Sequence, residues 1–289
     1  MHTVTAKGIL SHDNGMNLYR GCTHGCIYCD SRSKCYRMDH DFEDLEVKEN
    51  ALALLEAALR RKRRRCMIGT GAMTDPYIPP EMKLEQTRGA LLLIERYGFG
   101  VALQTKSDRV LRDLDILRRI NDKTKAVVQM TLTTADEALC RIIEPRVSTT
   151  RERVAALRTL RDAGIPTVVW LCPILPYIND TRENILQLLT WCAEAGVRGV
   201  LCFGMGLTLR EGNREYFYRQ LDAHFPGLKE RYMRAYGDSY VVNSPRGGQL
   251  MQLFHRFCEE NGMLHDVNAI FAYLHQFEEK NAPQQLTLW

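Results

Sequence analysis

Short apolar runs alternate along the chain with longer stretches in which apolar residues recur every three or four positions. The short runs are rich in β-branched residues and predict six strands, at 16–19, 66–69, 100–104, 126–131, 167–172 and 199–203. The longer stretches predict amphipathic helices, for example over 45–59 and 81–96. Alternation of this kind predicts right-handed βαβ units and a parallel sheet.

Helix boundary signals agree with this pattern. Thr149 and Glu152 have the spacing of a capping box, Gly164 is a plausible C-terminal stop, and Asp180 with Glu183 repeats the spacing. Beyond about residue 210 the predicted strands stop, and helices are predicted over 216–224, 228–236, 249–260 and 267–277.

The expected fold class is α/β. Six strand–helix units without a dinucleotide-binding glycine signature favour a partial (β/α)6 barrel of the TIM type over a doubly wound sheet. We expect this barrel in residues 1–209, and we expect the loop at 20–30, which contains closely spaced cysteines, to belong to the functional site. Residues 210–280 are expected to form a helical C-terminal cover of the same domain, and residues 281–289 an exposed tail.

Composition narrows the class of protein. The chain has 289 residues, of which 45% are hydrophobic and 26% charged, and a net charge of +4 that permits an anionic partner without requiring one. No apolar run reaches the ~18 residues needed to span a bilayer. Because the N-terminus also lacks the apolar core of a signal peptide, we expect a soluble, cytoplasmic protein without a membrane partner.

Ten cysteines are expected to be mostly reduced in that compartment. Six of them stand alone in apolar surroundings and are interpreted as buried small hydrophobes: Cys66, Cys140, Cys172, Cys192, Cys202 and Cys258. The other four lie close together between Cys22 and Cys35.

Cys22, Cys26 and Cys29 have the spacing C-x3-C-x2-C. A zinc site usually takes four ligands in two separated pairs, and the chain has no second CxxC or HxxxH. A dithiol redox motif would leave Cys22 without a role. Three thiolates on one tight loop suit a cubane iron–sulfur cluster in which one iron stays open.

The segment CTHGCIYC, with Tyr28 before the third cysteine, resembles the signature of the radical S-adenosylmethionine (SAM) superfamily. In that superfamily the open iron chelates the amino and carboxylate groups of the cofactor's methionine moiety. Electron transfer then cleaves the S–C5′ bond and yields a 5′-deoxyadenosyl radical. The resemblance implies a [4Fe–4S] cluster, S-adenosylmethionine and an electron donor of the flavodoxin or ferredoxin type.

Within the superfamily, residues 10–205 resemble the spore photoproduct lyase branch, the "DNA repair photolyase" relatives. The landmarks are NLYRGCTHGCIYC, GAMTDPYIPPE, QTKS, QMTLTT and IIEP. The resemblance implies a cluster at the C-terminal ends of the barrel strands and radical chemistry for repair or modification of nucleic acid. Radical modification of a peptide or protein side chain is the alternative, and a non-catalytic iron–sulfur subunit is a third interpretation.

The resemblance also assigns residues to the cofactor: Tyr28, Gly69, Thr70, Gly71, Asp75, Lys106 and Thr131. The glycine stretch would approach the methionine end, although it could equally be a plain βα turn. Lys106 matches a lysine that reaches the cofactor's carboxylate. Thr131 is preferred to Thr133 near the ribose because strand alternation places it on the same side as Gln129.

One position departs from the lyase pattern. The lyase has a cysteine just before its acidic motif that returns a hydrogen atom to the product radical, and this chain has Ala72 there. Alanine cannot donate, which puts thymine photoproduct reversal in doubt. Candidate replacement donors are Cys35, Tyr77, Cys172 and Cys202. Cys35 could instead be a fourth iron ligand or a structural thiol.

Three further features concern partners. The basic run from Arg60 to Arg65 could bind phosphates or be a solvated helix end on the face away from the cluster. Arg20 could contact the cluster or the surface. The tail from Gln285 to Trp289 resembles the peptide with which bacterial DNA polymerases and repair proteins bind the sliding clamp, but it could also pack on the barrel or seal a dimer.

Overall fold

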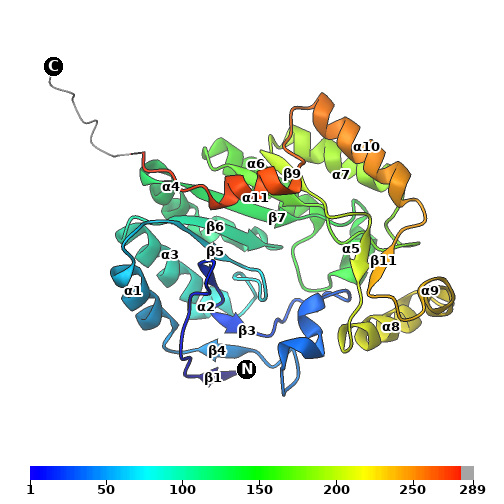
Figure 1. Ribbon diagram of the computed structural model, residues 1–289, viewed down its shortest axis with the longest axis horizontal. Coiled ribbons are helices and arrows are strands. Elements are labelled where there is room, and N and C mark those ends of the chain that lie inside the picture. The colour runs from blue at the N-terminus through cyan, green and yellow to red at the C-terminus, as the bar shows by residue number, and fades with distance from the viewer. Residues whose placement is uncertain (281–289) are drawn as a thin grey trace.

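A six-stranded parallel sheet forms the centre of the computed structural model, which describes residues 1–280 (Figure 1). Its strands follow one another in chain order: β2 (Gly15–Met16), β5 (Met67–Thr70), β6 (Gly100–Thr105), β7 (Ala126–Thr131), β8 (Thr167–Trp170) and β9 (Gly199–Leu201). Sequential order without a switch point distinguishes a barrel-type sheet from a doubly wound one. The predicted α/β fold of the partial (β/α)6 type is therefore confirmed.

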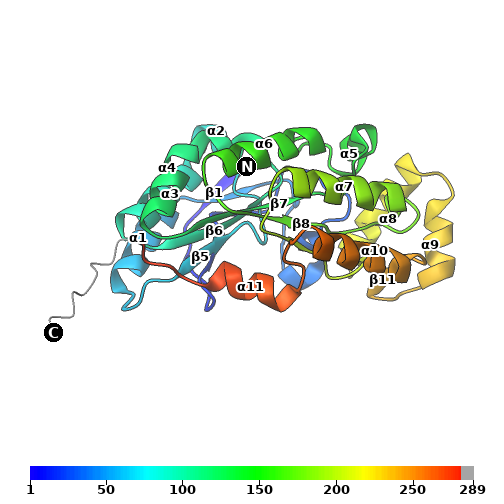
Figure 2. The same ribbon diagram turned by 90° about the horizontal axis from the view of Figure 1, so that it is seen from above.

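Helices cover the outer face of this sheet: α1 (Ala51–Arg61), α3 (Gln86–Arg96), α4 (Leu114–Lys123), α6 (Thr150–Asp162) and α7 (Arg182–Glu194). Strand alternation turns Leu103, Val128 and Val169 toward them, and these residues join the largest apolar cluster. Figure 2 shows α3, α4, α6 and α7 on one side of the sheet and α11 (Val267–His275) on the other.

The inner face of the sheet has a smaller apolar cluster. Ala102, Val127 and Val168 pack there against Ile270 and Leu274 of α11. The strand residues of this cluster lie mainly toward the beginnings of their strands. Helix α11 therefore closes that part of the inner face and leaves the C-terminal ends of the strands accessible.

The remaining elements build on this core. A three-stranded sheet contains β1 (His2–Val4), β4 (Glu46–Lys48) and β3 (Tyr19–Arg20), and an antiparallel pair joins β10 (Gly206–Thr208) to β11 (Val241–Asn243). The other helices are α2 (Glu81–Leu84), α5 (Glu137–Ile143), α8 (Asn213–His224), α9 (Leu228–Tyr236) and α10 (Gly247–Glu260). The described residues also include the 3₁₀ turns η1 (Asp30–Arg32), η2 (Lys34–Tyr36) and η3 (Asp108–Asp113).

Several element boundaries differ from the sequence prediction. The helix predicted over 45–59 begins only at Ala51, because the preceding residues form β4 between β1 and β3. The helix predicted over 81–96 is broken at Glu85, whose φ of 52° is left-handed. Strand β11 lies beyond residue 210, where only helices were predicted. The first strand, predicted at 16–19, is only two residues long.

The capping prediction is confirmed for α6, where the Thr149 and Glu152 side chains form a reciprocal capping box. For α7 it is wrong by one residue, since Thr181 caps the helix. Within residues 1–280 no helix is long and apolar enough to cross a membrane. The clamp-like motif that begins at Gln285 and ends at Trp289 lies outside the described residues.

Candidate active site

The loop between β3 and η1 brings the three motif cysteines around one cavity. Cys22 and Cys26 are buried, and Cys29 is half-buried. Neighbouring segments hold the loop, because the Cys22 amide donates to the Phe42 carbonyl at 3.0 Å and the Ile27 amide donates to the Ile143 carbonyl at 3.0 Å. The C-x3-C-x2-C spacing thus becomes a set of sulfur donors facing a common space.

These cysteines fit a cluster better than a single ion. All three cysteines come from one loop and line a single cavity, and a cubane cluster takes each cysteine sulfur at a separate iron. Burial raises the pKa of Cys22 to about 12 and that of Cys26 well above its usual value. Without iron these thiols keep their protons, so assembly of a cluster must displace them.

Asp75 orients the turn that follows β5. Its carboxylate accepts hydrogen bonds from the Tyr77 amide at 2.8 Å, the Thr105 hydroxyl at 2.7 Å and the Lys106 amide at 2.6 Å. It also lies 3.5 Å from Nδ1 of His24, a buried residue of the cysteine loop. With these protein partners, Asp75 joins the ends of β5 and β6 to the loop.

Lys106 is the cation of this site, and it lines both the cysteine cavity and a second cavity beside it. Although burial opposes the charged form, the Cys26 sulfur, when ionised as a cluster ligand, and the Glu144 and Asp75 carboxylates raise the pKa of Lys106. Its ammonium has no hydrogen-bond or ion-pair partner within residues 1–280, where only its backbone amide is bonded. A protonated amine in this position can bind a ligand's carboxylate.

Steric crowding explains why the turn after β5 has a glycine, Gly71. Gly71 has a φ of +99°, and a Cβ at this position would lie 2.0 Å from the Gln104 carbonyl oxygen. Close approach of β5 and β6 therefore requires glycine there. Gly69 and Thr70 precede it and line the cavity on the inner face of the sheet.

Ala72 lies where three cavities meet. It lines the cysteine cavity, the inner cavity with Gln104 and Gln129, and a mouth cavity with Tyr28 and Cys172. The mouth cavity measures about 340 Å³ and the inner cavity about 230 Å³. The residue that replaces the lyase cysteine is thus central to the site.

The predicted hydrogen donors are widely separated. Among the described residues, Cys172 is the one of the four that lines a cavity shared with the cysteine triad, and burial raises its pKa to about 12, which keeps it a thiol. Cys202 lines a different pocket, next to Met251. Tyr77 is fully buried and donates to Asp113, and Cys35 is exposed beside Arg210.

A buried ion pair that the sequence analysis did not assign supports the loop. The Tyr28 hydroxyl donates to Glu144, which pairs with Arg153, and both charged side chains are fully buried. Nη1 of Arg153 donates to the Thr131 carbonyl at the end of β7, at 2.7 Å. Tyr28 and Thr131, both predicted to bind the cofactor, are therefore linked through the glutamate of the IIEP landmark. Alternation places the Thr131 side chain on the same face as Gln129.

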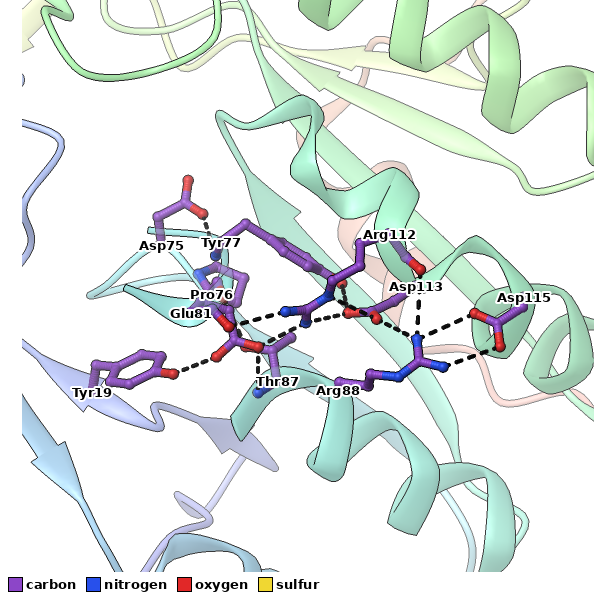
Figure 3. Close-up of polar contacts among 10 residues, drawn as sticks. All are labelled: Tyr19, Asp75, Pro76, Tyr77, Glu81, Thr87, Arg88, Arg112, Asp113 and Asp115. Carbon is purple, nitrogen blue, oxygen red and sulfur yellow. Dashed lines mark hydrogen bonds and ion pairs between the residues drawn. The ribbon is translucent and has the colours of Figure 1, made fainter. Parts of the chain in front are cut away.

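The DPYIPPE landmark carries a second polar network, drawn in Figure 3. Buried Glu81 accepts from the Tyr19 hydroxyl and from Arg112, and Arg112 also pairs with Asp113. Arg88 donates to Asp113 at 2.7 Å. These bonds fix the segment after Asp75 against η3 and α3.

Arg20 and Arg65, two of the basic residues that the sequence analysis singled out, contact protein groups. Nη2 of Arg20 donates to the carbonyls of Tyr36 and Arg37, which ties β3 to the segment after the cysteine loop. The run from Arg60 to Arg65 spans the end of α1 and the approach to β5, and Arg65 pairs with Glu279 at 2.7 Å. This run therefore lies at the opposite end of the strands from the cysteine loop.

Comparison with known proteins gives a consistent result. The model of the Radical SAM superfamily matches residues 16–189. The uncharacterized protein Rv2578c of Mycobacterium tuberculosis is 33% identical over 227 residues, which cover 76% of this chain and 66% of the relative. The uncharacterized protein MJ0683 of Methanocaldococcus jannaschii is 30% identical over 172 residues, which cover 59% of this chain and 63% of the relative. The chain thus spans slightly less than two thirds of the length of these relatives.

Among solved structures, a spore photoproduct lyase mutant with dinucleoside spore photoproduct superposes with a TM-score of 0.65. It is 17% identical, and the match covers 90% of this chain and 78% of that chain. A double mutant of spore photoproduct lyase with bound AdoMet and dinucleoside spore photoproduct matches with a TM-score of 0.64 at 16% identity, over 90% of this chain and 78% of that chain. At such identities the likeness concerns the fold.

The residues present fit the cofactors that this superfamily uses, a [4Fe–4S] cluster and S-adenosylmethionine. Three cysteine sulfurs surround one cavity, and beside them stands an ammonium without a partner in the described part of the chain. From the cysteine loop, the six-stranded sheet and the match over residues 16–189, the chain belongs to the radical SAM superfamily of enzymes.

Proposed function

We propose that this protein cleaves S-adenosylmethionine at a [4Fe–4S] cluster held by Cys22, Cys26 and Cys29, and that it uses the reaction to repair or modify nucleic acid. The observation that carries the proposal is the cavity that these cysteines line together with Lys106. When bound, the cluster and the cofactor supply radical hydrogen abstraction. An electron donor of the flavodoxin or ferredoxin type would reduce the cluster.

The protein's own residues have separate tasks in this proposal. Lys106 binds the carboxylate of the cofactor, and Asp75 holds the backbone of Lys106 in place through the bond to its amide. Tyr28, Glu144 and Arg153 fix the cysteine loop against β7. Burial of the loop keeps water away from the reacting groups.

An aromatic group at the cavity mouths supports a nucleic-acid substrate. The rings of Trp170, Phe203 and Phe271 lie with centroids 5.7 to 6.2 Å apart, and Phe203 is 60% exposed. Trp170 is the last residue of β8 and Phe203 follows the end of β9, on the face where the cysteines lie. Nucleobases stack on aromatic rings of this kind, and each such contact is worth about 1–3 kcal/mol.

The inner cavity offers groups that could bind a base edge. The indole nitrogen of Trp170 donates to Gln129 Oε1 at 2.9 Å, which leaves the Gln129 amino group for a ligand. Gln104 lines the same cavity and also reaches the cysteine cavity. Amide groups beside aromatic rings are a common way to bind an unpaired base.

The test is anaerobic turnover with reduced flavodoxin, S-adenosylmethionine and three substrate pools: damaged DNA, RNA and carrier peptides. We expect 5′-deoxyadenosine formation that is stimulated by nucleic acid and lost in Cys26→Ala. Replacement of Phe203 by alanine should weaken binding of single-stranded oligonucleotides without loss of iron. Stimulation by peptides alone would favour the alternative of peptide or protein side-chain modification, for which the absence of a thiol at Ala72 is the motivating observation.

We also propose that the tail from Gln285 to Trp289 binds the DNA sliding clamp, which the motif QLTLW supports. Leu286, Leu288 and Trp289 supply the apolar side chains that such small interfaces depend on. A labelled peptide of residues 283–289 should bind purified clamp with micromolar affinity. A peptide with Leu288 and Trp289 changed to alanine is the control, and no binding at about 1 mM, roughly −4 kcal/mol, would reject docking.

A further inference from the structure

A second group of metal-ligand side chains lies outside the cysteine site. We propose that His2, His40 and Glu46 bind a divalent ion of the zinc class. The ion would join the N-terminal strand to the segment that supports Cys22. The proposal does not depend on radical chemistry, because it rests on the small sheet of β1, β4 and β3, seen in blue below the main sheet in Figure 1.

Strand register brings two of the ligands together. β1 runs parallel to β4, and His2 is paired with Glu46. His40 lies on the segment before β4, where its Nε2 is 2.7 Å from Glu46 Oε1. One ring nitrogen of each histidine and one Glu46 carboxylate oxygen all lie within 4.8 Å of one another. Two imidazoles and a carboxylate form a known ligand set for zinc.

The hydrogen bonds of both rings leave the correct nitrogen for a metal. Nδ1 of His2 lies 3.0 Å from the Asp44 carboxylate, and Nδ1 of His40 lies 3.0 Å from the Asp41 carbonyl oxygen. An Nδ1–H that donates to such an acceptor makes Nε2 the lone-pair nitrogen, as in metal-bound histidines with a supporting carboxylate or carbonyl. Each histidine therefore already has the outer partner that a metal ligand requires.

The contact between His40 and Glu46 shows what a metal ion would replace. With Nδ1 of His40 donating to a carbonyl, its Nε2 faces a carboxylate oxygen at 2.7 Å. A proton on Nε2 makes this contact an ion pair, and a zinc ion would take the place of that proton. In zinc sites the N and O ligands lie about 2.0–2.2 Å from the ion, so His2, whose side chain is 42% exposed, has to move closer.

Arg20 is the competing cation. Its Nη1 lies 3.4 Å from Glu46 Oε1, while Nη2 is held by the carbonyls of Tyr36 and Arg37. Those carbonyls fix the guanidinium at one side of the carboxylate, and the histidines stand together at 5.0 Å between ring centroids. The ion would thus have three protein ligands and an open position for water.

The site has a structural link to the cluster loop. The segment between His40 and Glu46 includes Phe42, whose carbonyl accepts the Cys22 amide at 3.0 Å. An ion bound to both ends of this segment would restrict its motion. We therefore expect zinc to slow loss of the cluster from the reconstituted protein.

The experiment uses the full chain with its cluster reconstituted anaerobically and dialysed against Zn²⁺. Elemental analysis should find one zinc per chain besides about four irons. Zinc K-edge absorption should show only nitrogen and oxygen ligands, at ~2.0–2.2 Å. A sulfur shell at ~2.3 Å would mean that zinc occupies the cysteines, and it would overturn the proposal, as would a protein that retains no zinc.

Three variants and a control complete the test. His2→Gln, at an exposed position where misfolding is not expected, and His40→Ala should lose zinc and keep iron. Asp44→Asn should bind zinc about 10–100-fold more weakly, since it removes the carboxylate partner of His2 Nδ1 together with the ion pair between Asp44 and the Met1 amine. His12→Ala, which removes a fully exposed histidine paired with Asp13, should retain zinc. Undiminished zinc in His2→Gln would reject the site.

Discussion

Lys106 and Asp75 show at the scale of single residues how one site contains two kinds of charge. The Asp75 carboxylate is engaged by backbone and side-chain donors of the protein, whereas the Lys106 ammonium has no partner within residues 1–280. A charge with satisfied hydrogen bonds orients its neighbours. A charge without a partner beside a cavity is available to a ligand.

Replacement of Lys106 by methionine should weaken S-adenosylmethionine binding while the iron content stays unchanged. A charge-assisted hydrogen bond contributes about 1.5–3 kcal/mol, so the dissociation constant should rise about 10- to 150-fold. Equilibrium dialysis with labelled cofactor measures this. Lys83→Met, an exposed lysine on α2, is the matched control, and equal affinity in the two variants would remove Lys106 from the binding site.

At the scale of elements, the site depends on how loops are fixed to strand ends. The Glu144–Arg153 pair joins α5, α6 and β7 to the cysteine loop through Tyr28. Although burial opposes it, Arg153 and Lys106 lower the pKa of Glu144, so this carboxylate stays ionised. Both partners are buried, and loss of one leaves an uncompensated charge.

Arg153→Met should therefore lower the free energy of unfolding by about 3–5 kcal/mol, because Glu144 would remain buried without its partner. Tyr28→Phe removes only one hydrogen bond and should cost about 1 kcal/mol with the iron retained. Urea denaturation under anaerobic conditions compares the two. If Arg153→Met lowers the free energy of unfolding no more than Tyr28→Phe does, the Glu144–Arg153 pair does not support the cysteine loop.

The turn after β5 offers a comparison of two glycines. Gly71→Ala would place a methyl group 2.0 Å from the Gln104 carbonyl oxygen, so β5 and β6 would have to separate. Gly164→Ala has a similar positive φ, +74°, but open space around the new Cβ. Gly164→Ala, the control, should lower the free energy of unfolding by only about 1–2 kcal/mol, the cost of a left-handed backbone at a non-glycine residue. Gly71→Ala should lower the free energy of unfolding, measured by urea denaturation, by clearly more. Equal losses of unfolding free energy in the two variants would mean that β6 can shift to make room for the methyl group at position 71.

At the scale of the whole molecule, Ala72 lies where three cavities meet: the cysteine cavity, the inner cavity and the mouth cavity. Each cavity has residues from several elements that are distant in the sequence. The side chain at this junction is only a methyl group.

We predict that the protein does not cleanly convert a spore photoproduct dinucleotide to two thymidines, because alanine has only strong C–H bonds and no weak S–H hydrogen to return to the product radical. Ala72→Cys should increase any thymidine yield by placing a thiol at the junction. Chromatography of products after anaerobic turnover measures both, and Ala72→Ser is the control of similar size. Clean conversion by the unaltered protein would show that another group, such as Cys172, acts as the donor.

Local sequence was sufficient for the cysteine triad, the six-stranded parallel sheet and the N-terminal cap of α6. Each depends on spacing within a few residues or on periodicity within one element, which the chain displays directly. The C-x3-C-x2-C triad required no long-range information, since its three sulfurs come from one loop.

Tertiary structure decided the rest, because those features join residues far apart in the chain. Glu144 and Arg153 gain a role only when α5 and α6 pack beside the cysteine loop, and the short strands β1, β3 and β4 are stable only as partners of one another. Only the structure shows that Cys172 lines the mouth cavity, whereas Tyr77 is fully buried in the interior. Periodicity describes one element at a time, whereas a site and a core are properties of several elements in contact.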